Sequence, residues 1–390
     1  ANPHFPWEGE LRFTETHLTV GDEIDIYGAQ LLGVPGIGIG FTEGVAWTHT
    51  VSAGKRLTAY LLTLDPASPT SYLVDGETRP MTSIDHTISI LRADGTVDEE
   101  TRTLWSSEYG PIVDFPGLGW TDSAVLSFRD ANIDNDEFIE QYLDMISVQS
   151  LDDLQAVHAE HQGVPLFNTV ATGADGRVWY ADTAATPHLS DEAQQLFVEK
   201  LFSDPITQIG YDNGVVLLDG SDSRFVWESV PCARDDGLVP FAEMPMVERT
   251  DYVFNANESF WVPSDEFTLD GSFSILHGEQ NTPLSMRTRQ NAAVLSADNR
   301  TVVMEATDWS ADGITDYTGV DDMVLITLAK QPEAGDIIYI DVLLEGDVDQ
   351  SILLDNVFSN PRFDPVARTI WFDSSNWNDP VYVGIRAQKD

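Results

Sequence analysis

The sequence has 390 residues, of which 42% are hydrophobic and 10% aromatic, a composition typical of a folded protein and not of a disordered acidic chain. Its 65 Asp and Glu residues outnumber 20 Lys and Arg residues, so the formal net charge is −45 at pH 7. Such a charge repels phosphate backbones and anionic membranes, which argues against nucleic-acid binding. No apolar stretch approaches the roughly 18 to 20 residues of a membrane-spanning helix, so we expect no membrane span.

The acidic residues are spread along the whole chain, whereas only four residues are Lys. This pattern predicts a salt-adapted surface, because in about 1 M salt the Debye length falls to about 3 Å and self-repulsion is screened. An ordinary acidic secreted protein is the alternative. The single Cys232 cannot form an internal disulfide or a zinc site of Cys ligands. The chain starts at Ala1 without Met or a leader, which predicts a processed chain or a fragment.

The first 130 residues read as antiparallel strands. Short alternating or apolar runs, such as residues 57–64 and 88–90, are separated by turn signals at Asp75-Gly76 and Asp94-Gly95. Residues 136–147 and 151–161 then follow a helical pattern, and we expect both helices to lie on a sheet.

A predicted hairpin over residues 168–178 turns at Asp175-Gly176. The stretch that follows it, up to Trp227, reads as rich in loops, and another strand is predicted around residues 251–261. We therefore expect an α+β domain over residues 1–308.

The last part of the chain changes character. Residues 323–328, 337–344, 369–372 and 381–385 are predicted strands with no helical pattern between them, at a spacing typical of a β-sandwich. A polar linker between residues 308 and 319 separates this part from the rest. We predict a small all-β domain over residues 320–390.

Several patterns that suggest a cofactor or metal site have simpler explanations. The glycines of residues 33–40 are not followed by a phosphate-binding helix, so they indicate a tight strand-turn segment. Residues 130–136 imitate a calcium loop but lack its Gly and its bidentate Glu, so a turn before a helix is expected. His158 and His161 lack the spacing of a zinc helix and are expected to face solvent. We predict no metal and no cofactor.

Four dispersed residues could carry chemistry, although each has an ordinary structural explanation. His4 could be a buried hydrogen-bonded histidine, Val51 a plain strand residue and Arg287 a surface cation. Asn257 could be a turn residue, or with Ser259 a glycosylation sequon.

Nine short segments give these residues a common context: residues 2–7, 24–29, 40–41, 46–50, 109–111, 129–132, 162–165, 222–224 and 255–259. In this order they resemble the β-chain of the penicillin acylase family of N-terminal nucleophile amidohydrolases, especially its acyl-homoserine lactone and aculeacin acylase branch. The resemblance covers residues 1 to about 289. It implies an incomplete four-layer αββα sandwich, made from two chains cut from one precursor, and hence a separate α-chain as partner.

The resemblance also implies the roles of the site residues. The family's nucleophile is the Ser that begins the β-chain, and its α-amine is the general base. The Val51 N–H and the Asn257 amide would bind the oxyanion, His4 would orient the amine, and Arg287 would lie beside the site. The residues that match the family's acyl pocket are Phe5, Leu31, Tyr142, Leu166 and Phe167, with core packing as the alternative explanation for each.

Two departures from the family limit what this chain can do alone. The nucleophilic Ser is expected upstream of Ala1, so the chain by itself is expected to be inactive. The similarity fades near Leu295, where strands and helices that complete the sandwich are expected in the family. The tail, through residues 370–383, resembles instead the Ig-like or Calx-β-like repeats of surface proteins, which favours a secreted, cell-surface or periplasmic protein.

The leading hypothesis is a hydrolase of linear amides. It would remove an acyl chain from a small-molecule acylated amine such as an N-acyl-homoserine lactone, a lipopeptide or a β-lactam. The alternative is a non-catalytic cell-surface protein that binds acyl ligands or mediates adhesion with part of the acylase fold. A calcium-dependent adhesin is a third hypothesis, which the lack of a complete calcium loop disfavours.

Overall fold

A computed structural model describes residues 5–6, 8–21, 23–114, 119–264, 267–269, 271, 273–296, 302–307, 322–328, 332, 334–335, 337–341, 352–355, 360–377, 379 and 381–387. The chain forms two compact units, Ala1–Leu284 and Ser285–Asp390, and each is described by itself. The predicted linker at residues 308–319 lies outside the described residues, so the predicted domain limits stay a prediction. In the described part of the chain, no helix combines the length and apolar character that crossing a membrane requires.

The first unit contains a seven-stranded antiparallel sheet. Its strands, in order across the sheet, are β1 (Phe13–Val20), β2 (Ile24–Leu31), β3 (Ile39–Phe41), β4 (Val45–Val51), β12 (Phe167–Gly173), β13 (Val178–Asp182) and β15 (Met246–Arg249). The predicted hairpin is confirmed as β12 and β13, which turn at Asp175 and Gly176, the glycine with a positive φ of 89°. The glycine-rich segment forms the tight β2–β3–β4 meander: a Cβ on Gly28 would lie 2.1 Å from the Ile39 oxygen.

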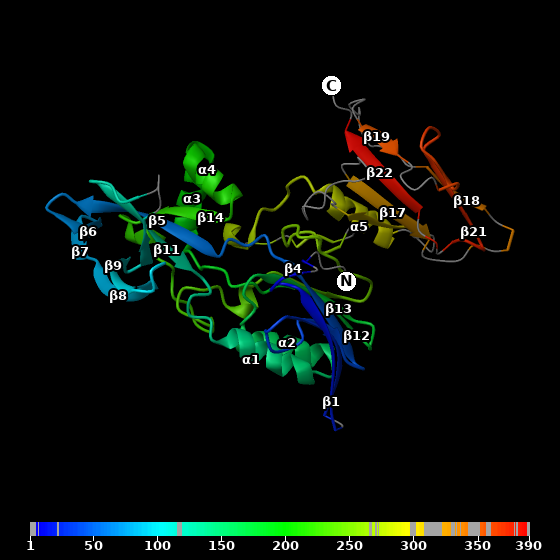
Figure 1. Ribbon diagram of the computed structural model, residues 1–390, viewed down its shortest axis with the longest axis horizontal. Coiled ribbons are helices and arrows are strands. Elements are labelled where there is room, and N and C mark those ends of the chain that lie inside the picture. Colours follow the sequence, from blue (N-terminus) through cyan, green and yellow to red (C-terminus); the bar gives the residue numbers. More distant parts are fainter. Residues whose placement is uncertain are drawn as a thin grey trace. The chain divides into compact units, whose positions relative to one another are not determined.

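Two helices cover one face of this sheet, as predicted (Figure 1). They are α1 (Glu137–Asp144), which continues as a 3₁₀ turn (Met145–Ser147), and α2 (Leu151–His161). The Ser150 hydroxyl caps α2 by accepting from the Asp153 N–H, and Gln162 ends the helix in the left-handed region. Leu151 and Leu154 pack on Trp47, Ala171 and Trp179 of the sheet. The predicted solvent-facing position of His158 is wrong, because His158 is fully buried and its ring contacts Trp179.

The second sheet of this unit has eight strands. Seven are antiparallel neighbours and β14 pairs in parallel with β5: β5 (Leu57–Asp65), β6 (Ser68–Val74), β7 (Glu77–Pro80), β8 (Thr82–Leu91), β9 (Val97–Ser107), β10 (Gly110–Val113), β11 (Ala124–Asp130) and β14 (Val215–Asp219). Its apolar core includes Tyr60, Leu62 and Val216, and helix residues such as Phe197 and Tyr211 pack into it.

Two further sequence predictions in this unit are wrong. The stretch expected to be loops contains α3 (Asp191–Ser203), α4 (Pro205–Asp212) and β14. Ser190 and Asp204 cap these helices by accepting from backbone N–H groups. The strand expected at residues 251–261 is absent from this described segment; the strand lies earlier, at β15, and residues 251–261 form turns and extended chain. Those turns place Asn257, as described below.

The second unit begins with α5 (Met286–Ser296) and continues as strands. Its two described sheets are β16 (Val302–Thr307), β17 (Asp322–Leu328), β22 (Val381–Ala387) and β19 (Ile352–Asp355), and β18 (Ile337–Asp341), β21 (Thr369–Asp373) and β20 (Phe363–Asp364). A small core forms around Phe363, Ile370, Phe372, Val381 and Val383. The four predicted strand segments of the tail are confirmed as β17, β18, β21 and β22.

Candidate active site

Val51 and Asn257, 206 positions apart, meet at the end of β4. The Asn257 Nδ2 donates a hydrogen bond to the Val51 carbonyl oxygen at 3.1 Å. Both residues are exposed, with 41% of Val51 accessible to solvent. The structure therefore brings together two residues predicted to form one oxyanion site, and that role stays a prediction.

The direction of the Val51 N–H follows from the register of the sheet. The Ser52 N–H donates to the Leu166 oxygen at 2.9 Å, and Val51 lies opposite Phe167. Because hydrogen-bonded and non-hydrogen-bonded pairs alternate in an antiparallel ladder, the N–H and C=O of Val51 both point away from β12. Among the described strands, β3 reaches that edge of β4 only at Ala46 and Trp47. The Asn257 amide, bonded to the Val51 oxygen, lies on the side toward which the Val51 N–H points.

Asn255 holds Asn257 in place. Its Oδ1 accepts from the Asn257 N–H at 2.8 Å and from the Thr50 hydroxyl at 2.6 Å, and its Nδ2 donates to the Glu258 oxygen at 2.9 Å. The turn puts Asn257 in the left-handed region, with φ of 61°. Asn adopts this conformation more readily than most other non-glycine residues. One side chain thus joins the Asn257 turn to the end of β4.

A fully buried amide extends this network below the surface. The Asn168 Nδ2 donates to the Thr50 hydroxyl at 3.1 Å and to the Asn255 Oδ1 at 3.4 Å. The Tyr180 hydroxyl donates to the Asn168 Oδ1 at 2.8 Å. Because each buried polar group has a partner, the arrangement of the turn over β4 is fixed.

Ser52, the residue after Val51, contacts a buried carboxyl. The Ser52 hydroxyl donates to the Asp182 Oδ2 at 2.8 Å and accepts from the Gly54 N–H at 2.9 Å. Asp182 is 1% exposed, and its Oδ1 accepts from the Ala184 N–H at 3.4 Å. Burial raises the pKa of the Asp182 carboxyl to about 7, although the bonds from Ser52 and Ala184 lower it in part. The sequence analysis missed this pair, which joins residues 130 positions apart.

His49 joins two of the predicted pocket residues. Its ring lies 5.7 Å from that of Phe167 and 5.6 Å from that of Tyr142, centroid to centroid. The His49 Nδ1 lies 3.2 Å from the Asn168 oxygen, which only accepts, so Nδ1 carries the hydrogen and Nε2 accepts from the Tyr142 hydroxyl at 3.1 Å. Burial lowers the pKa of His49 to about 4, while its bond to Asn168 opposes the shift. A neutral, mostly aromatic cluster therefore lies beside Val51.

Phe5 and Leu31 form a second group of predicted pocket residues. The Phe5 ring packs 5.1 Å from the Phe13 ring, and Phe13 lies directly opposite Leu31 in the β1–β2 pair. All three side chains are half-buried. The proposed pocket role of Phe5, Leu31, Tyr142, Leu166 and Phe167 stays a prediction.

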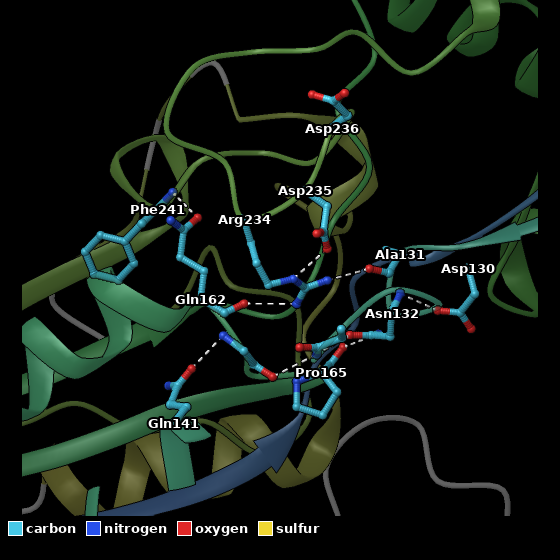
Figure 2. A network of polar contacts seen from close by, with 12 residues as sticks. Asp130, Ala131, Asn132, Gln141, Gln162, Pro165, Arg234, Asp235, Asp236 and Phe241 are labelled. Atoms are coloured by element: carbon cyan, nitrogen blue, oxygen red, sulfur yellow. Dashed lines mark hydrogen bonds and ion pairs between the residues drawn. The ribbon is translucent and has the colours of Figure 1, made fainter. Parts of the chain in front are cut away.

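The segment that leads into Leu166 and Phe167 is clamped by polar contacts (Figure 2). The Arg234 guanidinium donates to the backbone oxygens of Gln162 and Ala131, at 3.1 and 2.8 Å. The Asn132 amide donates to the Pro165 oxygen at 2.8 Å, and the Gly163 N–H donates to the Gln141 Oε1 at 2.6 Å. The turn predicted before α1 at residues 130–136 is confirmed, and through Asn132 it fixes the entry to β12.

The other predicted catalytic residues are placed less directly. His4 lies outside the described residues. Arg287 lies in α5 and is exposed, in the unit that is described separately from Val51 and Asn257. The roles of both residues stay predictions. Among the residues that the structure describes, no group of three or more His, Cys, Asp or Glu side chains is arranged to hold a metal ion.

Known proteins are similar in sequence to this chain over most of its length. The Penicillin amidase family profile matches residues 1–330. An acyl-homoserine lactone acylase PvdQ of Pseudomonas fluorescens is 39% identical over 290 residues, which are 74% of this chain and 36% of that protein. The aculeacin-A acylase of Actinoplanes utahensis is 36% identical over 290 residues, again 74% of this chain and 36% of that protein. The chain thus spans little more than a third of the length of these relatives.

A solved structure, a thermostable penicillin G acylase from Alcaligenes faecalis, aligns with a TM-score of 0.49 and 14% identity over 70% of this chain and 43% of that one. The family profile, which covers most of the chain, confirms the predicted fold class, an α+β fold of the N-terminal nucleophile hydrolase type. By this match, and by more than a third identity to curated acylases over three quarters of its length, the chain belongs to the penicillin amidase family.

Proposed function

We propose that this chain forms the oxyanion-binding part of an acylase that hydrolyses linear amides. The observation that carries the proposal is the convergence of the Asn257 amide on the side of β4 toward which the Val51 N–H points. Two donors on the same exposed side of a strand would suit a developing negative charge on a carbonyl oxygen. The two relatives described above, each more than a third identical to this chain, are named as acylases.

The proposed reaction uses a Ser that precedes residues 2–7 as the N-terminal residue of the mature chain. Its α-amine takes the hydroxyl proton while the oxygen attacks the amide carbon, and His4 orients that amine. The carbonyl oxygen becomes an oxyanion, which the Val51 N–H and the Asn257 amide stabilise. The leaving amine takes up the proton, and water then releases the acid from the acyl-enzyme and restores the Ser.

The proposed substrate carries a fatty or aromatic acyl group. Phe167 lies directly opposite Val51, and its ring stacks on His49, which is neutral at the pH of most assays. An aromatic, uncharged surface of this kind favours binding of an apolar acyl chain and has no charge to pair with a charged acyl group. N-acyl-homoserine lactones, lipopeptides and β-lactams are the candidate substrates, and the name of the Pseudomonas fluorescens relative contains the first of them.

The test is Asn257→Ala in the full-length gene product, assayed in high salt against an N-acyl-homoserine lactone. We expect kcat to fall about a hundredfold or more, because one oxyanion donor is lost. Asn281→Ala is the matched control, since Asn281 is also an exposed Asn in the left-handed region, with φ of 57°. An unchanged kcat in Asn257→Ala refutes the oxyanion assignment, and acyl binding without any turnover in the parent protein favours a non-catalytic acyl-binding protein.

A second test concerns the nucleophile and the proposed α-chain partner. Intact mass and N-terminal sequencing of the same gene product should show a chain that begins with Ser upstream of Ala1, together with a second chain from the same precursor. A mature chain that begins with any other residue contradicts the proposed mechanism.

The environment of the protein is proposed from its charge. With 65 acidic against 20 basic residues, we propose an exported protein of a salt-adapted organism. Dialysis from molar to millimolar salt should then cause a loss of ellipticity, whereas an ordinary acidic protein keeps its signal.

A further inference from the structure

We infer that Asp182 and Ser52 are positioning residues that fix the Val51–Ser52 peptide, and with it the place of the Asn257 amide relative to the Val51 N–H. The inference rests on the proposed function but concerns residues that touch no reacting atom. It extends the site from the exposed end of β4 into the interior of the sheet, where the carboxyl of Asp182 ends β13.

The peptide unit between Val51 and Ser52 is held at both ends. On one side its carbonyl oxygen accepts from the Asn257 amide at 3.1 Å, and on the other its N–H donates to the Leu166 oxygen at 2.9 Å. A rotation of this plane would displace the Val51 oxygen that holds the Asn257 amide, relative to the Val51 N–H of the preceding peptide. Its orientation therefore decides whether the two donors converge.

The Ser52 side chain supplies the third fixed point. Its hydroxyl donates to Asp182 at 2.8 Å and accepts from the Gly54 N–H at 2.9 Å, so the chain just after β4 is closed into a turn over the carboxyl. Without the bond to Asp182, Ser52 would keep only its contacts with the Leu166 oxygen and the Gly54 N–H. Because a small displacement of catalytic donors can cost up to about a hundredfold in rate, this contact matters for turnover.

Burying the Asp182 carboxylate lowers the stability of the folded state. Asp182 is buried, and among the described residues no basic side chain forms an ion pair with it. An uncompensated buried charge destabilises the fold, so packing alone does not explain an acidic residue here. Ionised, it accepts from Ser52; protonated, it can itself donate to the Ser52 oxygen, which reverses the bond that holds the turn.

The groups around Asp182 limit what else can titrate there. The Ser52 hydroxyl and the Ala184 N–H face it directly, and the phenol of Tyr180, two residues earlier on β13, has its pKa raised by burial and further by Asp182. On the adjoining turn, the His277 Nδ1 lies 3.3 Å from the Thr186 hydroxyl. Burial lowers the pKa of His277 to about 3, so this ring stays neutral while Asp182 titrates.

The test compares Asp182→Asn, Ser52→Ala and the double variant in the full-length gene product, with kcat and KM measured from pH 5.5 to 9. We expect each single variant to lose about tenfold in kcat at pH 8 with KM within about twofold. The double variant should lose no more than either single one, because both remove the same contact. Ser52→Thr, which keeps the hydroxyl, should restore most of the rate.

The pH profile separates positioning from a general loss of structure. In the parent protein the rate should rise with the ionisation of Asp182 near pH 7, and Asp182→Asn should lack that rise while keeping the one due to the α-amine. Asp122→Asn, the same change on an exposed turn, should leave kcat and the profile unchanged.

Three results would overturn the inference. A kcat in Asp182→Asn equal to the parent's refutes it while Asn257→Ala remains inactive, and so leaves the proposed function standing. Additive losses in the double variant show that the two residues act separately. If Asn257→Ala is fully active, the proposed function fails, and the positioning role fails with it.

Discussion

The two sheets of the first unit differ in what they bury. In the strands of the eight-stranded sheet the buried polar side chains are hydroxyls, among them Thr58 and Ser127, within an apolar core. The seven-stranded sheet buries an amide and a carboxyl, Asn168 and Asp182, at the ends of β12 and β13 that lie beside Val51.

This difference concerns how many hydrogen-bond partners each buried polar group needs. A buried hydroxyl can be satisfied by one backbone carbonyl, as the Tyr60 hydroxyl is by the Phe225 oxygen at 3.0 Å. An amide or a carboxyl needs several partners, and in the seven-stranded sheet these partners belong to the turns that carry Asn257 and Ser52. We therefore expect the core of the eight-stranded sheet to contribute mainly to stability, and this end of the seven-stranded sheet to support the proposed site as well.

The largest expected effect is the pH dependence that Asp182 confers. Its folded pKa of about 7 lies above the value of 3.8 for an ordinary Asp, so the folded state holds the proton more tightly. The stabilisation is fully present below about pH 4 and is lost as pH rises to about 7, by up to about 4 kcal/mol at 1.36 kcal/mol per pKa unit. Urea unfolding in high salt should show Asp182→Asn gaining that amount on the parent between pH 4 and pH 8; a constant difference would contradict the buried carboxylate.

The next effect concerns the apolar core of the eight-stranded sheet. Leu62→Ala should lower the free energy of unfolding by about 2 to 5 kcal/mol, because Leu62 is fully buried and its removal leaves a cavity. The kcat of the folded fraction should not change. Leu61→Ala, at a neighbouring position 42% exposed on the same strand, should cost less than about 1 kcal/mol. A matching loss of kcat in Leu62→Ala would end the division of roles between the sheets.

The smallest expected effect compares the same substitution in the two sheets. Tyr60→Phe and Tyr180→Phe each remove one buried hydroxyl that donates one hydrogen bond, to the Phe225 oxygen and to the Asn168 Oδ1. Each substitution should lower the free energy of unfolding by about 1 kcal/mol, measured by thermal or chemical denaturation. Only Tyr180→Phe should also lower kcat, since Asn168 contacts Asn255 and Thr50 in the site. Equal kcat values for the two variants would show that the buried amide is purely structural.

Much of the strand order along the chain could be predicted from local signals. The runs at residues 57–64 and 369–372 and the turn at Asp175-Gly176 carry period-2 patterns and turn residues, and each is found as a strand or turn. Helix α3 had signals too, since Ser190 precedes Asp191 and Glu192 as a capping residue precedes a helix, but its weak amphipathic pattern concealed them. The apolar residues Tyr252, Val253 and Phe254 suggested a strand, but the polar turn at Asn255 ends the run.

The candidate site also contains residues that could be predicted from the sequence and residues that could not. Val51 and Asn257 were found only through the resemblance of short segments to a family, because neither residue has a local signal of function. Asp182 and Ser52 could not be found, since their contact depends on the order of β4, β12 and β13 across the sheet. His49 stood within one of the matching segments, but its contact with Tyr142 requires α1 to be docked on the sheet.

The path of the chain between the two sheets has a consequence for synthesis. The chain builds β1 to β4 in one sheet, then β5 to β11 in the other, returns for β12 and β13, crosses to β14 and comes back for β15. Leu57 in β5 pairs with Asp130 in β11 on one side and with Val215 in β14 on the other, so this strand gains its second neighbour only after more than half of the described unit has been made. Such long-range pairing slows folding and ties both sheets into one cooperative step. We therefore expect the nascent chain to remain open to proteases until β15 has left the ribosome, and to become resistant all at once.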